Sequence, residues 1–162
     1  MPKPRLQALL DAYAADHQHP MNRATHKLGV PLVLFHILAM LGWIELAAVP
    51  GLPFPLTAAH LLGLCVLPWY LSLDLKLALL VSAVSVLFMA ISPLVPVWAV
   101  LLITALAWAL QLVGHYRYEK RSPSFFKNLL QLLVGPLFIA AVFTGDWRPA
   151  GAARATGTAA GG

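Results

Sequence analysis

Residues 17–48 read HQHPMNRATHKLGVPLVLFHILAMLGWIELAA. The first part of this stretch is rich in histidine and carries basic and amide side chains, and from about residue 30 it becomes almost entirely apolar. An apolar run of about 20 residues is long enough to cross the hydrocarbon core of a bilayer as a helix. The stretch therefore predicts a membrane-spanning helix that starts beside a cluster of polar side chains.

Apolar runs of this kind recur along the rest of the chain. They lie at residues 30–48, 54–72, 75–92, 94–113 and 128–143, of which the last is shorter and interrupted by Gly135 and Pro136. The chain is 60% hydrophobic and only 10% charged, with a mean hydropathy of +0.78, whereas soluble domains carry about 25% charged residues. We therefore expect an all-α integral membrane helical bundle with four spans and a fifth short apolar helix that either spans or re-enters.

The N-terminal segment is too polar to span the membrane, but it carries a helical stripe. The stripe is formed at spacings of three and four by Leu6, Leu9, Leu10, Tyr13 and His17. A short helix with one apolar face typically lies at the membrane surface. Pro20 is typical of a first helical turn and Gly29 of a C-terminal cap, so we expect a second short interfacial helix between them.

The length of the chain and its even hydropathy predict one membrane-embedded domain over residues 1–145. Residues 146–162 are mostly glycine, alanine and threonine, and we expect them to form a disordered tail. The single cysteine, Cys65, rules out a disulfide within the chain. Nothing in the sequence indicates the oligomeric state.

The basic residues predict how the bundle is oriented. They gather on either side of the first four apolar runs, as Lys3, Arg5, Arg23 and Lys27 before them and Arg117, Lys120, Arg121 and Lys127 after them. By the positive-inside rule both groups face the cytoplasm, which requires an even number of spans between them. The net charge of +5 thus fits contact with membrane lipid rather than with nucleic acid. We expect the bacterial inner membrane.

A second polar cluster, QLVGHYRYEKRSPS at residues 111–124, lies on the same predicted side of the membrane. Gln111, His115 and Glu119 are four residues apart, so they share one helix face. Asn22 and His26 share a face in the same way. A bend at Pro20 lets His17 converge with His26, which predicts a site at the mouth of the bundle formed by His17, Asn22, His26, His115 and Glu119.

Imidazoles with one carboxylate and no thiolate favour iron, zinc or manganese over calcium. Tyr13, one turn before His17, and Gln111, one turn before His115, are positioned to orient these two histidines. The alternative is that His115 and Glu119 form an ordinary pair on a helix surface.

His36, His60 and Glu45 also lie within predicted spans, where ionisable side chains are suspected of function. Two histidines on different helices can ligate haem, but His36 and His60 are expected near opposite faces of the membrane. We therefore expect each to bond a neighbouring hydroxyl or carbonyl group, and Glu45 to reach water.

The two clusters carry a resemblance to a known family. Their patterns are Tyr13-x3-His17-x4-Asn22-x3-His26-x2-Gly29-x-Pro31 and Gln111-x2-Gly114-His115-x3-Glu119-x3-Pro123. In order and spacing they resemble the small membrane family typified by the fungal endoplasmic-reticulum 2-hydroxy fatty acid dioxygenase. The resemblance extends from residue 13 to about residue 143. The family usually has Pro-Ala where this chain has Pro123-Ser124, and it tends to keep an acid in the last apolar run, where this chain has none.

The resemblance implies an Fe(II)-dependent α-oxidation, in which O2 converts a 2-hydroxy fatty acid to the acid one carbon shorter with loss of CO2. It implies His17, His26 and His115 as metal ligands, and we expect Glu119 to be a fourth ligand or a base. Catalytic support is expected from Asn22 and Tyr13, and substrate contacts from Arg23, Lys27, Gln111 and Arg117.

Two other classes of function remain open at this point. A zinc-dependent membrane lipid hydrolase can use the same ligands with an activated water. A serine esterase is disfavoured because there is no Gly-x-Ser-x-Gly motif. A non-enzymatic lipid-binding or transport protein is the third class, although the spans carry few polar residues at mid-depth.

Overall fold

The structure is a computed structural model that describes residues 3–126 and 128–147. It is mostly helical, with 78% of the described residues in helices. The α-helices are α1 (Pro4–Ala15), α2 (Pro20–Gly42), α3 (Ala58–Leu73), α4 (Leu75–Ile91), α5 (Val97–Leu112) and α6 (Leu130–Thr144). The shorter elements are β1 (Glu45–Ala47), β2 (Leu56–Thr57), the 3-10 helices η1 (Ser92–Leu94) and η3 (Ser124–Phe126), and the π-helix η2 (Val113–Glu119).

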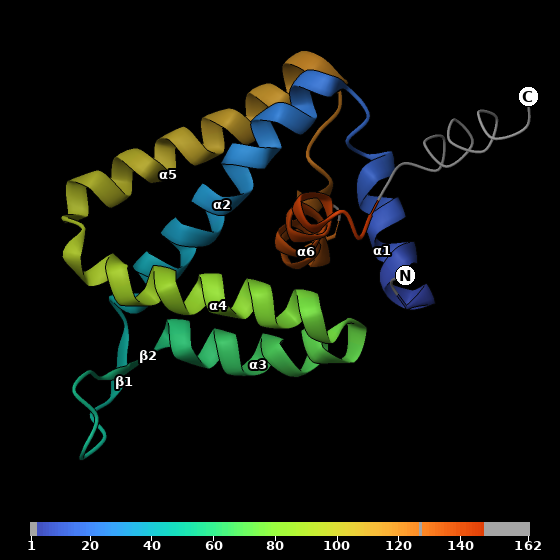
Figure 1. Ribbon diagram of the computed structural model, residues 1–162. Helices are drawn as coiled ribbons and strands as arrows, with labels where there is room; N and C mark the ends of the chain where they lie inside the picture. Colours follow the sequence, from blue (N-terminus) through green and yellow to red (C-terminus); the bar gives the residue numbers. More distant parts are fainter. Residues whose placement is uncertain (1–2, 127, 148–162) are drawn as a thin grey trace, which may run out of the picture.

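Two pairs of helices form the frame of the molecule (Figure 1). Helices α2 and α5 lie side by side in opposite directions, and α3 and α4 form a second antiparallel pair that crosses the first. Because η2 continues directly from α5, the start of α2 and the end of η2 meet at one end of the α2–α5 pair. The two polar clusters of the sequence are therefore brought together, as predicted.

The two tight turns between the later helices have local causes. Asp74 ends α3 and begins α4, and its carboxylate accepts a hydrogen bond of 3.0 Å from the backbone N–H of Leu77. An N-cap of this kind typically stabilises a helix by about 1 kcal/mol. Pro96 is the N-cap residue of α5. The N–H groups at the start of a helix have no partner within the helix, so a proline there removes no helical hydrogen bond. Both turns lie where the apolar pattern predicts them.

The expected end of a short helix at Gly29 is wrong, because α2 runs through Gly29 and Pro31 without a break. Gly29 instead allows α5 to approach: a Cβ there would lie 3.1 Å from Gln111 Nε2 and 3.4 Å from Leu110 Cβ. Small residues are typical of closely packed helices in membranes, where proline within a helix is also tolerated. Packing against α5 therefore explains this glycine better than a helix cap does.

A short β-hairpin corrects the all-α expectation. Glu45 pairs with Thr57, and Ala47 with Leu56, in an antiparallel arrangement between α2 and α3. Gly51 in the connecting loop has a φ of +90°, which glycine adopts readily. The hairpin lies at the end of α2 that is far from the polar clusters (Figure 1).

Helices α2, α4 and α5 are long and apolar enough to cross a membrane when α4 is counted with η1 and α5 with η2, whereas α3 and α6 are shorter. Large side chains on several helices are exposed, including Leu64 at 67% and Leu102 at 62%. Exposed apolar surface of this extent requires lipid or another apolar partner. Membrane association is thus supported, and the number of four spans stays a prediction.

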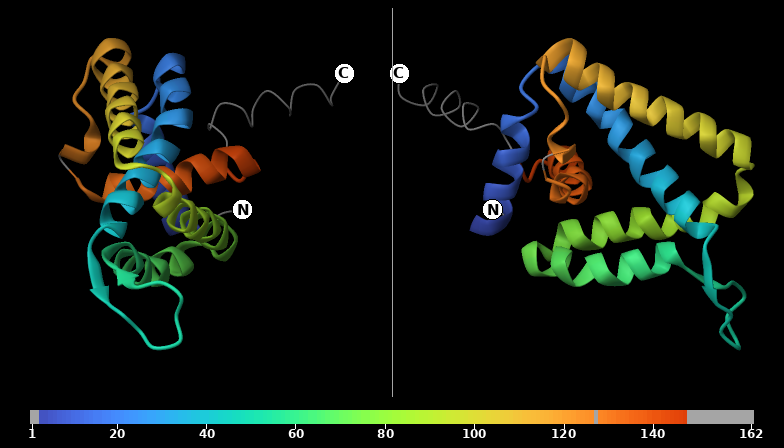
Figure 2. Two further views of the ribbon diagram at one scale, coloured as in Figure 1. Left: turned by 90° about the vertical axis from the view of Figure 1, so that its left-hand side faces the viewer. Right: turned by 180° about the vertical axis from the view of Figure 1, so that it is seen from behind.

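Helix α6 differs from the other apolar helices because it is largely buried, from Val134 to Ala141. It is seen nearly end-on in Figure 1 and from the side in the left view of Figure 2, so it runs across the α2–α5 pair. Leu6 and Leu10 of α1 belong with it to the largest apolar core. Helix α1 therefore covers α6, and α6 closes the space beside α2.

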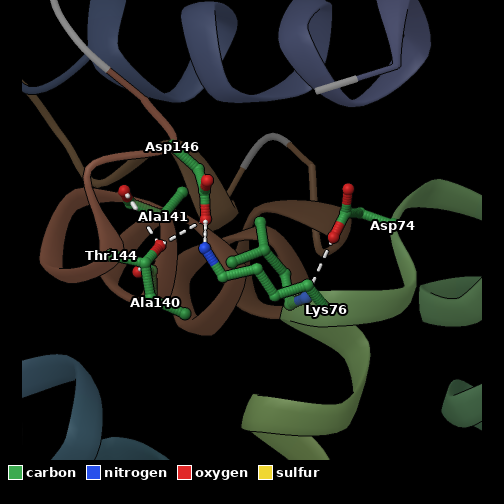
Figure 3. A network of polar contacts seen from close by, with 7 residues as sticks. Asp74, Lys76, Ala140, Ala141, Thr144 and Asp146 are labelled. Carbon is green, nitrogen blue, oxygen red and sulfur yellow. Dashed lines mark hydrogen bonds and ion pairs between the residues drawn. The ribbon is translucent and has the colours of Figure 1, made fainter. Parts of the chain in front are cut away.

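The segment after α6 is also held in place. Lys76 Nζ lies 2.8 Å from Asp146 Oδ2, and Thr144 donates a hydrogen bond to the same carboxylate (Figure 3). These interactions lower the pKa of Asp146. Trp147 is buried and donates to Asp11 at 2.9 Å. The folded part thus extends two residues past the predicted boundary at 145, and Lys127 and residues 148–162 of the predicted tail lie outside the described residues.

Candidate metal centre

His17 lies in the turn between α1 and α2, where the chain bends before Pro20. Its Nδ1 is 2.6 Å from the backbone oxygen of Tyr13, one turn earlier. The Tyr13 ring stacks on the imidazole at 4.1 Å between centroids, with 9° between the planes. Tyr13 therefore fixes both the direction and the tilt of the His17 ring, in agreement with the predicted contact.

His26 is held in the same way by its own helix. Its Nδ1 is 2.9 Å from the backbone oxygen of Asn22. A carbonyl oxygen can only accept a hydrogen bond, so Nδ1 carries the proton in both histidines. The Nε2 atoms of His17 and His26 are then left with free lone pairs. This is the usual arrangement of imidazoles that bind a metal.

His115 is presented by the π-helix η2. The wider turn ends at Lys120, a non-glycine residue with a φ of +55°, and the carbonyl of His115 accepts hydrogen bonds from the backbone N–H groups of Lys120 and Arg121. Single π-turns within α-helices are frequent at functional sites. The turn directs His115 toward the two histidines of the first cluster.

The three imidazoles converge. Their ring centroids lie 4.4 Å apart for His17 and His26, and 4.8 Å apart for each of these with His115. One potential ligand atom from each side chain lies within 4.8 Å of the others, and all three residues are 3% exposed. Burial lowers the pKa of His17, which keeps this ring neutral near pH 7. The donor set fits a transition-metal ion such as iron or zinc.

Glu119 joins the two clusters without belonging to this group of three. Its Oε1 accepts a hydrogen bond of 2.6 Å from the backbone N–H of His19 and one of 3.1 Å from Asn22 Nδ2. A carboxylate at the start of α2 also interacts favourably with the helix dipole. Through Asn22, whose carbonyl holds His26, the carboxylate is linked to one of the three imidazoles.

We expect Glu119→Ala to weaken metal binding about 10- to 100-fold, the usual effect of removing a group that orients a ligand. Glu119→Gln keeps one acceptor and should have a smaller effect. Competition with a chelator measures both. Glu45→Ala is the control, because Glu45 is exposed in the β-hairpin. Equal affinity in the wild type and Glu119→Ala would contradict this role.

Gly114 lets η2 approach α2 closely beside the histidines. A Cβ at this position would lie 2.5 Å from Thr25 Oγ1, 3.2 Å from His26 Cε1, and closest of all to Asn22 Oδ1. That Asn22 oxygen is buried and accepts no hydrogen bond from the described residues. Only glycine fits this contact, so the order Gly114-His115 serves packing and ligation at once.

Among the described residues, Tyr13, His17 and His26 line two cavities whose other walls differ. The first, of about 350 Å³, also has Arg23 and Lys27 in its wall. The second, of about 360 Å³, is mostly apolar and includes His115 and Gln111. Arg117 is exposed and lines neither cavity. The structure thus brings all the predicted site residues except Arg117 to the histidines, the cavities or the Glu119 bridge.

Comparison with known proteins shows the family of this chain. The family model described as "2-hydroxy-palmitic acid dioxygenase Mpo1-like" matches residues 4–147, which include both polar clusters. The chain belongs to the Mpo1-like family. A protein of Saccharomyces cerevisiae named 2-hydroxy-palmitic acid dioxygenase MPO1 is 30% identical over 142 residues, which cover 83% of this chain and 76% of the yeast protein. No solved structure matches the chain.

The structure of this Mpo1-like chain also shows one contact of a predicted residue, Arg23, and one further residue, Gln131, that the sequence analysis missed. Arg23 Nε donates a hydrogen bond of 2.7 Å to the backbone oxygen of His17, so Arg23 helps to hold the turn that carries this histidine. Gln131 lines the apolar cavity, and its buried Oε1 has no hydrogen-bond partner among the described residues. The single amide in the apolar run LLQLLV, residues 129–134, was the available signal for Gln131.

The other histidines of the apolar runs are satisfied locally, as expected. His36 Nδ1 lies 3.1 Å from the backbone oxygen of Leu32. His60 forms a capping box with Thr57 at the start of α3. Neither belongs to the group of three histidines.

Proposed function

We propose that this chain is a membrane-bound, Fe(II)-dependent dioxygenase that converts 2-hydroxy fatty acids to the acid one carbon shorter. The observation that carries this proposal is the group of three buried imidazoles at the meeting point of a basic and an apolar cavity. The name of the yeast relative supports the substrate class. In the overall reaction a 2-hydroxy acid and O2 give the shortened acid, CO2 and water, so the substrate itself supplies every electron that reduces O2.

In this proposal His17, His26 and His115 hold the metal. An iron ion held there would supply activation of O2 and a Lewis acid for a substrate that carries adjacent hydroxyl and carboxylate oxygens. Tyr13 and Asn22 keep Nδ1 of their histidines protonated through the backbone carbonyl groups. Burial raises the pKa of the Tyr13 hydroxyl, so this group stays neutral and provides packing for His17 rather than charge.

The protein's own charges orient the substrate. Arg23 and Lys27 line one cavity beside His17 and His26, where they stabilise the carboxylate of a fatty acid. Gln111 lies in the other cavity and provides an amide next to His115. Arg117 is exposed on η2 and lines neither cavity, so in this scheme it contacts substrate or lipid headgroups only at the protein surface. Glu119 is a positioning residue in this scheme, and its use as a fourth ligand or base stays a prediction.

We further propose four membrane spans with the site on the cytoplasmic face. The supporting observations are the apolar exposed helices and the basic residues beside both polar clusters. The crossing direction and the short length of α6 favour an interfacial or re-entrant position for this helix. The bacterial inner membrane stays a prediction, and the yeast relative shows that the family also occurs in a eukaryote.

The test of this proposal measures whether the Fe(II)-loaded protein converts a 2-hydroxy fatty acid. The chain is purified in detergent without oxygen, loaded with Fe(II) and exposed to air with 2-hydroxypalmitate, and products are followed by mass spectrometry. We expect the acid one carbon shorter, and no product from palmitate, which lacks the hydroxyl group. Absence of turnover together with stoichiometric zinc and ester hydrolysis would overturn the proposal in favour of a zinc-dependent lipid hydrolase.

A further inference from the structure

The apolar cavity has a direction along α2. The α2 residues in its wall are His26, Val30, Val33, Leu34 and Ile37. Their spacings of one, three and four place them on one face of the helix. At about 1.5 Å per residue, the distance along the helix from His26 to Ile37 is ~16 Å. The cavity wall therefore runs from the metal centre toward the middle of the apolar frame.

The remaining walls are mostly apolar along the same path, with the amides of Gln111 and Gln131 among the lining side chains. Trp108 of α5, Leu62 of α3, and Leu132 and Leu133 of α6 face the cavity. Tyr70 also lines it, with its hydroxyl donating a hydrogen bond of 2.7 Å to the backbone oxygen of Leu133. This bond ties α3 to α6 across the cavity wall. Arg23 and Lys27 line the other cavity only.

A cavity with metal-ligating groups at one end and hydrocarbon along its length suits an amphiphile with a single straight chain. An extended chain of tetrahedral atoms advances about 3.6 Å per three bonds, so ~16 Å accommodates about 13 bonds. We propose that this cavity holds the acyl chain of the substrate, with the carboxylate turned toward Arg23 and Lys27, and that Ile37 at the far end limits chain length. This inference rests on the proposed function, since it uses the same substrate class.

The test compares chain-length profiles of variants at position 37. Unlabelled 2-hydroxy acids of graded length compete with radiolabelled 2-hydroxypalmitate for the metal-loaded protein in detergent, and turnover of the same acids is measured in parallel. Ile37→Trp shortens the cavity. It should weaken binding of 2-hydroxypalmitate at least tenfold while leaving 2-hydroxydecanoate within about twofold of the wild type. Leu106→Trp is the control, because Leu106 is exposed on α5 and does not line the cavity.

Ile37→Ala keeps the proposal testable if the tryptophan variant does not fold. It lengthens the cavity, so the affinity for 2-hydroxy acids longer than 2-hydroxypalmitate should rise several-fold relative to that for 2-hydroxypalmitate. Unchanged profiles in both variants, or a profile that also shifts in Leu106→Trp, would overturn the inference. Length-dependent binding that shifts at position 37 without any turnover would support the acyl site and contradict the proposed reaction. Absence of binding of every 2-hydroxy acid to the wild type would overturn both.

Discussion

His26→Ala and His115→Ala should each yield protein that retains almost no metal after purification. Each substitution removes one of three imidazoles that converge on a single point. Removing a residue that only orients a ligand typically lowers metal affinity 10- to 100-fold. Removing one of three ligands should lower the affinity further. Metal content per chain, measured by mass spectrometry after anaerobic loading with Fe(II), checks this prediction.

His36→Ala provides the matched control for the histidine variants. His36 lies on the same helix as His26, is equally buried, and directs its Nδ1 to the carbonyl four residues earlier in the same way. Its loss therefore removes a comparable side chain without removing a ligand, so the metal content should stay at the wild-type value. A full complement of metal in both His26→Ala and His115→Ala would contradict the three-histidine site, whatever the activity of these variants.

Gly114→Ala should lower both the stability of the protein and its affinity for the metal. The added methyl group would overlap the side chains of Asn22 and Thr25 on α2, which must turn or shift with their helix and so disturb their hydrogen bonds to Glu119 and to the Asn22 carbonyl. Overpacking of this kind typically costs about 1–3 kcal/mol. Since the same methyl group would lie 3.2 Å from His26 Cε1, the shift should also displace a ligand. Thermal unfolding in detergent and chelator competition measure the two effects.

Gly63→Ala is the corresponding control, because a Cβ at Gly63 meets nothing within 4 Å on α3. Alanine favours a helix by about 1 kcal/mol over glycine, so this variant should be as stable as the wild type or more so. An unfolding temperature for Gly114→Ala that equals that of Gly63→Ala would show that η2 and α2 do not approach as closely as described.

The features that could be predicted from the sequence are those with local causes. Long apolar runs indicate the helices, because each residue there adds apolar surface that water disfavours whatever its partners are. The contacts of His17 with Tyr13 and of His26 with Asn22 each span four residues, so one turn of helix brings the groups together. The convergence of the two clusters was also predictable, because basic residues beside the spans indicate a common membrane face.

Other features depend on contacts between distant parts of the chain. The continuity of α2 through Gly29 follows from packing against Gln111, and the bond from Glu119 to Asn22 joins residues 97 positions apart. Neither can be found from a spacing rule. The position of α6 across the bundle also depends on such contacts, because residues of α1 and Trp147 pack against it in the same apolar core. The sequence by itself indicated which residues are candidate metal ligands and which segments avoid water. Only the tertiary structure decided how closely the helices approach, and with that the two cavities and the roles of Gly114 and Glu119, because these depend on the shape of surfaces that meet after folding.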